Sequence, residues 1–375
     1  MIRNAWTLLA AGTSLAATGF AANAALSAFF LRKPGESVIT DTVSVLLPVR
    51  NEIDTVTRCV ESILAQDAID ELIIYDDAST DGTGELVKAL AHSDSRVSIA
   101  SAPPGSSPPP NWFGKTWACH QMSKLASGTV MVFIDADVVL EPGAIGSAVS
   151  LLRHQRFDLV SPYPRQLADG MLPRLIQPLL QWSWMSFVPL RISEYAQPPS
   201  MAVANGQFLV IDANQYDRVG GHASVAHQVV EDVALARVIR RSGGRTAVVD
   251  GTHIATCRMY NSASGLVDGY AKSLWTAFRK SRSAAATVSA LLLIYVIPPV
   301  ALVIGPTART RKWGLLGYSA AVASRIVVAR RTGQRVIPDV FSQPLSVLAL
   351  AGIAAISLQR KRSDQLSWKG RSLAG

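Results

Sequence analysis

The sequence has few cysteines and few acidic residues, and each shortage excludes a class of protein. Three cysteines occur in 375 residues, at positions 59, 119 and 257. Their odd number and wide spacing provide neither a disulfide framework nor a C-x-x-C metal site, so reduced, buried thiols are expected. The 27 acidic residues are outnumbered by 36 basic ones, which gives a net charge of +9.

No nucleic-acid-binding motif accompanies this positive charge. Many of the basic residues flank apolar segments instead. Positive charge in that position suits the anionic surface of the cytoplasmic leaflet of a membrane. We therefore expect a membrane partner and no nucleic-acid partner.

Charged residues are missing altogether from two long stretches, 5–31 and 284–308, of 27 and 25 residues. Each can cross a hydrocarbon core, which takes roughly 20 helical residues. Residues 340–359 form a third uncharged stretch. Residues 313–329 are interrupted by Arg325, so this stretch can cross the membrane, pack inside a bundle or lie at the surface. The chain is thus expected to be a multi-pass protein.

The first apolar stretch has two interpretations. Arg3 before it and Ala-Asn-Ala at 22–24 also occur in secretory signal peptides. A signal peptide, however, has an apolar region of only about 7–15 residues. The longer run favours a membrane anchor, and Arg32 and Lys33 after it would hold the following domain on the cytoplasmic side of the inner membrane. The basic clusters near the C-terminus leave the number and orientation of the later crossings open.

Between the apolar stretches, residues 36–283 alternate strand and helix patterns. Strands are predicted at 43–47, 71–75, 97–101 and 130–133, and helices at 53–66, 84–91 and 116–126. This alternation implies an α/β fold with a parallel sheet and right-handed crossovers.

The central prediction concerns residues 130–140, an apolar run that contains Asp135 and Asp137. The carboxyl end of such a strand is where open α/β sheets bind ligands. Residues two positions apart in an extended chain point the same way, so both carboxylates can face one Mg²⁺ or Mn²⁺ ion shared with a nucleotide diphosphate. A solvated turn is the alternative interpretation of the same pattern.

Polar residues also follow the other predicted strands. Pro48 and Glu52 follow the first strand, and Asp77 follows the second, where a carboxylate can accept the imide N–H of uracil. Asp81 is interpreted as a cap of the next helix. Lys115 opens a helix after a proline-rich loop, a natural position from which to face a phosphate.

Further along the chain, Glu231 and Asp232 form a second carboxylate pair at a predicted helix start, where acidic residues also serve as simple dipole partners. His253 is either a metal ligand or, as we favour, a structural residue. Residues 175–190 are uncharged and broken by prolines, so they form either an interfacial segment near the acceptor entrance or part of the core.

Four motifs in order, VSVLLPVRNE, YDDASTDGT, FIDAD and the late Glu-Asp pair, resemble the inverting glycosyltransferases of family 2, which have the GT-A fold. The resemblance spans residues 43–283. NWFGKTWA, CRMYNSASGLVDGYAKS and the apolar C-terminal stretches are similar to the membrane-anchored bacterial subgroup that includes carotenoid-associated and hopanoid-associated enzymes.

The resemblance implies roles for the candidate residues. Pro48 and Glu52 belong to the first nucleotide loop, Asp77 binds uracil, and Lys115 lies near the diphosphate. The remaining roles are metal ligand and catalytic base. Asp137 is the principal ligand of Mg²⁺ or Mn²⁺, Asp135 lies nearer the ribose and sugar and shares the metal, and Asp232 is the base with Glu231 beside it.

Two departures from the family pattern matter. Ala78 replaces the usual glycine after the paired aspartates. The Q-x-x-R-W element of processive polysaccharide synthases is absent, because the similar residues at 181–184 have the wrong order. Short glycolipid products are therefore favoured over long polymers.

The sequence thus predicts an inverting, metal-dependent transfer of a sugar from a UDP-sugar to a membrane lipid of carotenoid, hopanoid or polyprenyl type. The expected domains are an anchor at 1–33, a GT-A domain at 34–283, C-terminal spans at 284–359 and a basic tail at 360–375. Polysaccharide synthesis is the alternative. A nucleotidyltransferase lacks support because no glycine-rich basic loop follows the first strand, and the intact acids argue against a non-catalytic interaction protein.

Overall fold

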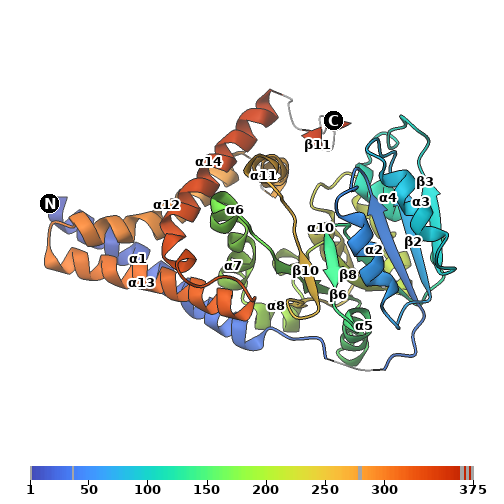
Figure 1. Ribbon diagram of the computed structural model, residues 1–375. Helices are drawn as coiled ribbons and strands as arrows, with labels where there is room; N and C mark the ends of the chain where they lie inside the picture. The colour runs from blue at the N-terminus through green and yellow to red at the C-terminus, as the bar shows by residue number, and fades with distance from the viewer. Residues whose placement is uncertain (1, 36–37, 278–280, 364–366, 369–370, 373–375) are drawn as a thin grey trace. The chain divides into compact units, whose positions relative to one another are not determined.

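A computed structural model of the protein describes residues 2–35, 38–277, 281–363, 367–368 and 371–372. The chain divides into two compact units, and each combines segments that are distant in sequence (Figure 1). The sheet unit comprises Leu31–Leu167 and Ile192–Met259, and the helical unit comprises Met1–Phe30, Ala168–Arg191 and Tyr260–Ala374. Two segments within the range 34–283 expected for a single domain therefore pack with the helical unit. They are 168–191 and the described residues 260–277 and 281–283.

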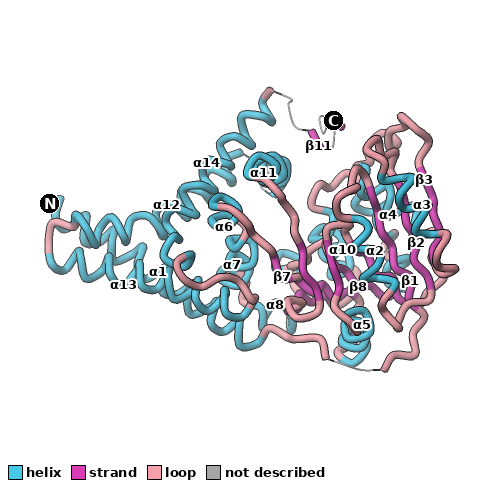
Figure 2. The backbone as a smooth tube through the Cα atoms, viewed as in Figure 1, coloured by secondary structure: helices cyan, strands magenta, loops and turns pink. Residues whose placement is uncertain are grey.

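A mixed sheet, seven-stranded within the described residues, forms the centre of the sheet unit (Figure 2). Its strands are β1 (Val43–Val49), β2 (Glu71–Asp76), β3 (Val97–Ser101), β4 (Val130–Ile134), β6 (Leu159–Tyr163), β8 (Phe208–Asp212) and β9 (Thr246–Asp250). The spatial order is β3-β2-β1-β4-β8-β6-β9. The four strands predicted from the sequence run parallel, whereas β8 runs antiparallel to both β4 and β6. The fold is thus α/β with a sheet that is parallel in its first half.

Helices cover both faces of this sheet. One face packs against α2 (Val56–Leu64), α3 (Thr83–Ala91) and α5 (Ala144–His154). The other packs against α4 (Gly114–Ser123), α9 (Ala213–Arg218), α10 (Glu231–Arg241) and the short helix η2 (Gly221–Val225). Val45 and Leu47 of β1 point to the first face and Leu46 to the second, and all are buried. This two-sided burial explains the continuous apolar run in β1.

A small second sheet in the same unit contains β5 (Val138–Leu140), β10 (Ala255–Cys257) and β7 (Arg165–Gln166). Since β5 begins directly after Asp137, the segment with both aspartates is held between strands of two sheets. The other short elements of the chain are α8 (Leu190–Ala196), η1 (Pro199–Met201), β11 (Ser367–Trp368) and β12 (Arg371–Ser372).

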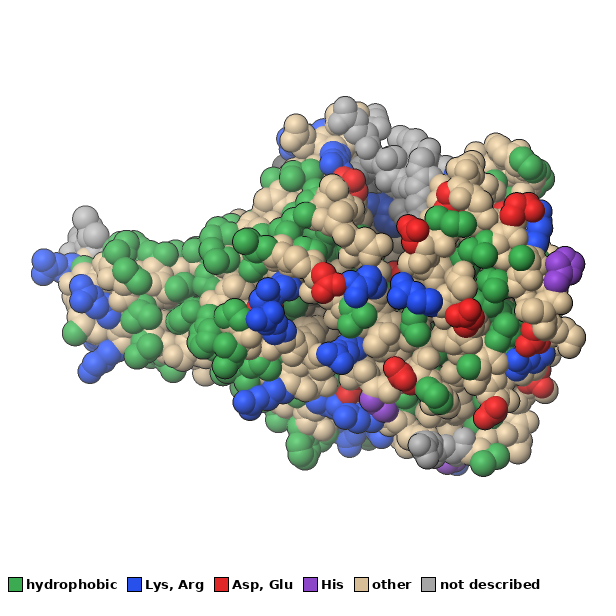
Figure 3. Space-filling model, viewed as in Figure 1, with side chains coloured by type: hydrophobic (Ala, Val, Ile, Leu, Met, Phe, Trp, Pro, Cys, Tyr) green, Lys and Arg blue, Asp and Glu red, His purple; other side chains and the backbone are tan. Residues whose placement is uncertain are grey.

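The helical unit contains α1 (Ile2–Phe30), α6 (Met171–Ile176), α7 (Pro178–Phe187), α11 (Ala263–Ala277), α12 (Ser281–Ile304), α13 (Ala308–Arg331), η3 (Asp339–Ser342) and α14 (Gln343–Arg362). Among the described residues, three helical segments are long and apolar enough to cross a membrane: Arg3–Phe30, Ser283–Ile304 and Asp339–Arg362. They correspond to the three stretches predicted to span. Figure 3 shows hydrophobic side chains gathered over the visible face of this unit.

The stretch 313–329, whose location the sequence leaves open, belongs to α13. This helix packs along α1 and α12. Arg325 is 3% exposed and donates a hydrogen bond to Oε1 of Gln343 at 3.0 Å. The arginine that interrupts the apolar pattern is therefore satisfied by a neighbouring helix. This face of α13 packs against the other helices of the unit, whereas Leu315 and Leu316 are exposed.

The proline-broken stretch 175–190 forms α6 and α7, which also pack in the helical unit. The indole of Trp182 is 2% exposed and donates a hydrogen bond to Oγ of Ser324 at 2.9 Å. Its ring lies edge-on to Tyr295 with the centroids 4.9 Å apart. These contacts favour the core interpretation of the segment.

Candidate functional site

The loops after β1 and β2 are joined by hydrogen bonds that fix the backbone of the DDAST segment. The carboxylate of Asp76 accepts the N–H and the hydroxyl of Ser79 at 3.1 and 2.5 Å. Arg50 donates to the carbonyls of Asp77 and Ala78. Ala78 has a φ of +54°. Glycine adopts this left-handed conformation without strain, which explains why glycine is usual at this position.

Asp77 is the second residue of this DDAST segment. Its N–H donates to the carbonyl of Val49 at 2.9 Å, and the residue is 4% exposed. Pro48 precedes Val49 in β1 and pairs in register with Tyr75 of β2. Pro48 and Asp77 are therefore both at the carboxyl edge of the parallel strands, as predicted.

Glu52 and Asp81 link the two loops to the start of α3. The N–H of Glu52 donates to Oγ1 of Thr83 at 2.8 Å. Asp81 accepts the N–H groups of Thr83 and Ile53 at 3.0 and 3.2 Å. Burial opposes ionisation of Asp81, but these hydrogen bonds outweigh it and lower its pKa. Asp81 thus holds the first turn of α3, although Gly82 occupies the cap position itself.

Lys115 connects two of the predicted acidic groups. Its Nζ lies 2.7 Å from Oδ1 of Asp135 and 3.0 Å from Oε1 of Glu231. Burial alone would lower the pKa of Lys115, but the two carboxylates outweigh it and raise the pKa well above its ordinary value. Burial likewise raises the pKa of Glu231, and the lysine more than reverses this, so the carboxylate is ionised. The fixed position of Lys115 follows from its place in the first turn of α4.

Asp137 is half-buried and interacts electrostatically with this group. Its Oδ1 atom has no hydrogen-bond partner within the described part of the chain. Burial, together with the charges of Asp135 and Glu52, raises the pKa of Asp137 to about 7. A buried carboxylate under like-charge repulsion is stabilised by a cation. No group of three or more His, Cys, Asp or Glu side chains placed to hold a metal occurs among the described residues.

Asp232 begins α10 next to Glu231. One oxygen accepts the N–H of Gly206 at 2.7 Å, and the other accepts the N–H of Val233 at 2.7 Å. Burial and the charge of Glu231 raise the pKa of Asp232 to about 7. A carboxylate with such a pKa can take up a proton near neutral pH, which is what a general base requires.

The turn 205–207 is a part of the site that sequence reasoning missed. A side chain at Gly206 would place its Cβ 2.9 Å from Nζ of Lys115 and 3.2 Å from Oε1 of Glu231, so only glycine fits without a shift. The carbonyl of Gln207 accepts the N–H of Asp135 at 3.1 Å. The available signal was the Asn-Gly pair before the apolar run of β8, a common turn sequence.

Gln207 also leads to a buried polar chain. Its Oε1 accepts from Asn205 and Gln166 at 2.9 and 2.8 Å, and its Nε2 lies 2.9 Å from Sγ of Cys257. The thiol of Cys257 contributes to lowering the pKa of Asp137 against the larger effect of burial. The turn therefore contacts both aspartates of the D-x-D motif, directly or through Cys257.

The structure thus places Lys115, Asp135, Glu231 and Asp232 in one cluster, with Asp137 electrostatically coupled to it through Asp135. Pro48, Glu52 and Asp77 lie in the adjacent loops of the same sheet edge. His253 is separate, because its Nε2 lies 3.0 Å from the carbonyl of Pro34. This contact supports the structural interpretation of His253.

Comparison with known proteins identifies a family for the first part of the sheet unit. Residues 44–174 match the family model described as glycosyl transferase family 2. The chain carries a family 2 glycosyltransferase domain. Within that match lie the DDAST turn, Lys115 and both aspartates of the D-x-D motif, whereas Glu231 and Asp232 lie beyond it.

Two curated relatives share the name 4,4'-diaponeurosporenoate glycosyltransferase. The one from Staphylococcus aureus is 23% identical over 351 residues, which cover 88% of each chain. The one from Staphylococcus haemolyticus is 24% identical over 253 residues, which cover 66% of this chain and 64% of that protein. This chain thus matches less than two thirds of the second relative.

A solved structure extends the likeness to the fold of nearly the whole glycosyltransferase chain. It is the mannosyltransferase PcManGT from Pyrobaculum calidifontis in complex with GDP-Man and Mn²⁺. The TM-score is 0.58 at 17% identity, and the match covers 95% of this chain and 99% of that one. At this identity the likeness concerns the fold alone, which is the GT-A fold predicted from the sequence.

Proposed function

We propose that this family 2 glycosyltransferase moves one sugar from a nucleotide diphosphate sugar to a membrane lipid, with inversion at the anomeric carbon. The observation that carries the proposal is the cluster in which Lys115 bridges Asp135 and Glu231 beside Asp232. It combines a cation, which can stabilise a departing diphosphate, with a half-buried carboxylate whose pKa of about 7 suits a base.

The donor side of the proposal rests on the loops after β1 and β2. Asp77 would accept the imide N–H of uracil, and Pro48 and Glu52 would border the nucleotide. We therefore propose a UDP-sugar as donor. Because the solved relative holds GDP-Man, a side-by-side assay with UDP-sugars and GDP-sugars tests this assignment, and transfer from GDP-sugars alone would contradict it.

A divalent cation fits the residues present. Asp137 offers a buried oxygen without a hydrogen-bond partner among the described residues, and Asp135 is two positions away. Mg²⁺ is commonly bound through one or two carboxylates together with substrate phosphates, so the short protein ligand set is no obstacle. When bound, Mg²⁺ or Mn²⁺ would neutralise charge on the diphosphate.

The chain's own residues account for the remaining chemistry. Asp232 removes the proton from the acceptor hydroxyl, whose oxygen forms the new bond to the anomeric carbon on the face opposite the departing diphosphate. The ion pair with Glu231 positions Lys115, which stabilises the negative charge that develops on the leaving diphosphate. The N–H of Gly206 orients the carboxylate of Asp232.

The acceptor is proposed to be an apolar lipid of the carotenoid type. Two relatives are named for such an acceptor, and the helical unit carries three candidate membrane spans. Because the chain has no Q-x-x-R-W element, each encounter should add one sugar or very few. A long polysaccharide in place of short glycolipids would favour the alternative, a polymer synthase.

The decisive experiment measures transfer from labelled nucleotide sugars into extractable lipid by membranes that contain the protein. EDTA should abolish transfer, Mn²⁺ or Mg²⁺ should restore it, and Asp137→Asn should behave like the chelated enzyme. Glu85→Gln is the control, because Glu85 is an exposed acid on α3. Full activity of Asp137→Asn would remove the metal assignment.

A further inference from the structure

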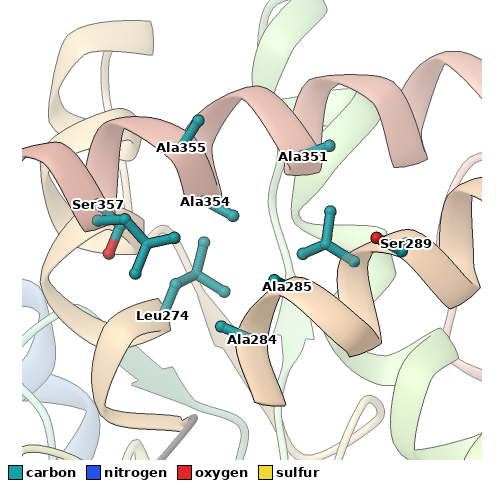
Figure 4. Close-up of a pocket in the computed structure, with 10 residues that line it drawn as sticks. Leu274, Ala284, Ala285, Ser289, Ala351, Ala354, Ala355 and Ser357 are labelled. Atoms are coloured by element: carbon teal, nitrogen blue, oxygen red, sulfur yellow. The ribbon is translucent and has the colours of Figure 1, made fainter. Parts of the chain in front are cut away.

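Carboxylates that can hold a cation lie in the catalytic cluster and not in the apolar groove between α11, α12 and α14. Alanines, other aliphatic residues and two serines line that groove, and none of its lining residues is charged (Figure 4). In the D-x-D motif, Asp137 has an oxygen without a hydrogen-bond partner among the described residues, whereas Asp135 is paired with Lys115. The two candidate metal ligands therefore differ in how available they are to a cation.

Lys115 engages Asp135 through both carboxylate oxygens. Its Nζ lies 2.7 Å from Oδ1 and 2.9 Å from Oδ2. A third contact, of 3.0 Å, joins Nζ to Oε1 of Glu231. An ammonium group carries three N–H donors, so these three oxygens can use all of them. A phosphate oxygen can therefore gain a hydrogen bond from Lys115 only if one of these contacts is given up.

The ammonium of Lys115 competes with any metal ion that takes Asp135 as a ligand. Because Nζ is close to both oxygens, it occupies the place of a cation bound to both. Two positive charges on one carboxylate repel each other strongly at such short separations. Asp137 alone is a sparse site, since Mg²⁺ is commonly bound through one or two carboxylates together with substrate phosphates.

A diphosphate offers Lys115 an alternative partner. Lys115 belongs to the first turn of α4, and the N–H groups at the start of a helix favour a phosphate. The four-carbon stem of a lysine is flexible. On one side the stem ends beside Gly206, where a Cβ would lie 2.9 Å from Nζ. Since that side chain is missing, none at 206 obstructs the movement of Nζ from Asp135 towards a phosphate at the helix start.

We propose that Lys115 makes binding of the metal depend on binding of the nucleotide. Lys115 holds Asp135 as long as no diphosphate is bound, and a diphosphate releases Asp135 by taking over N–H donors of the lysine. Asp135 is then free to share with Asp137 the cation that neutralises the diphosphate. The inference rests on the donor and the metal of the proposed function, and it adds that the two bind cooperatively through Lys115.

The experiment measures the Mn²⁺ affinity of the purified full-length protein from the EPR signal of unbound Mn²⁺, without nucleotide and with saturating UDP. GDP is used in parallel, so that the result does not depend on the base. Lys115→Met should bind Mn²⁺ about tenfold more tightly than the wild type without nucleotide, because the competing charge is gone. With saturating nucleotide both proteins should bind Mn²⁺ similarly, so the enhancement by nucleotide should fall about tenfold.

Three further variants separate the loss of charge from other effects. Lys115→Arg keeps the charge and can bind Asp135 through two parallel hydrogen bonds, so without nucleotide it should bind Mn²⁺ no more tightly than the wild type. Lys88→Met removes an exposed lysine that pairs with Glu85 on α3, and it should behave like the wild type. Asp135→Asn combined with Lys115→Met should remove the tenfold gain, because the gain acts through that carboxylate.

Equal or weaker Mn²⁺ binding by Lys115→Met without nucleotide would overturn the proposal. A gain that survives Asp135→Asn, or that also occurs in Lys115→Arg, would contradict it as well. In these cases the wild type still binds Mn²⁺ together with a nucleotide, and the proposed function stands. If the wild type binds no Mn²⁺ with either nucleotide, the metal assignment of the proposed function fails together with this inference.

Discussion

At the scale of single residues, the character of Asp232 decides how the acceptor is activated. An acceptor hydroxyl must lose a proton, whereas a carboxylic acid acceptor, with a pKa of about 4, is already ionised at neutral pH. The names of the relatives denote a carboxylate acceptor in those proteins. In this chain, burial and Glu231 raise the pKa of Asp232 to about 7, a value suited to a base, and this favours a hydroxyl acceptor.

Asp232→Asn should then lower turnover by roughly 10²–10⁴-fold at saturating donor. In the wild type, the rate should rise as pH increases through about 7, because the base acts only when deprotonated. The measurement is turnover against pH with the cell's own lipid extract as acceptor. A fall of less than about tenfold, with the Michaelis constant for the donor unchanged, would assign a carboxylate acceptor and remove the general-base role.

Gly206 sets the spacing of the cluster. A methyl group there would lie 2.9 Å from Nζ of Lys115 and 3.2 Å from Oε1 of Glu231, and one of these groups must move. A displacement of about 1 Å can cost roughly 100-fold in rate, so Gly206→Ala should lose about that much turnover while keeping its fold.

The control for this prediction is Gly35→Ala, since among the described residues no atom beyond its chain neighbours lies within 4 Å of the added carbon. Thermal unfolding of both variants should remain close to that of the wild type. Wild-type turnover in Gly206→Ala would show that the turn does not position Lys115 or Glu231.

At the scale of elements, close helix contacts hold the helical unit together. A Cβ at Gly314 of α13 would clash with the N atom of Leu302 and would lie 2.6 Å from the carbonyl oxygen of Pro298, both in α12. Small residues permit such approach between helices in a membrane. Gly314→Ala should therefore destabilise the unit by about 1–3 kcal/mol, the usual effect of overpacking.

Gly12 of α1 is the matched control, because an added carbon meets no atom within 4 Å. Gly12→Ala should be neutral or should stabilise the helix by about 0.5–1 kcal/mol. Thermal unfolding in detergent compares the two variants. Equal unfolding temperatures would mean that α12 and α13 do not pack as closely as described.

The hydrophobic pattern of the sequence predicted those strands and helices whose surroundings are apolar along their whole length. Strands β1, β2 and β4 are buried on both faces and are apolar runs, and each of the three candidate spans contains a long uncharged stretch. The pattern did not predict β8, although residues 208–212 are equally apolar, because the neighbours of a strand depend on contacts distant in sequence. α13 was ambiguous for the same reason, since the partner of Arg325 lies on another helix.

The candidate site likewise contains residues that the sequence predicted and residues that it did not. Acidic groups and Lys115 could be predicted because their side chains carry charge at recognisable positions. Gly206 and Gln207 could not, because they act through a backbone N–H, a backbone carbonyl and a missing side chain. The ion pairs of Lys115 with both Asp135 and Glu231 also join residues too far apart in sequence for spacing to reveal.

At the scale of the whole molecule, the proposed reaction requires the sheet unit to face the cytoplasm, because the proposed donor is a cytoplasmic nucleotide sugar. Arg32 and Lys33 follow the first candidate span, and positive residues after a span favour retention on that side. The three native cysteines are buried, so they should give little background with a thiol reagent. An exposed serine in the proline-rich loop, Ser107, therefore offers a site for a single reporter.

Ser107→Cys should not react with a membrane-impermeant maleimide on intact cells, and it should react readily once the cells are permeabilised. The wild-type protein, with only buried thiols, gives the background in both conditions. Transfer activity of the variant confirms that the labelled protein is folded. Labelling of intact cells at the permeabilised level would place the sheet unit outside the membrane, away from the proposed donor, and would contradict both the topology and the cytoplasmic location of the reaction.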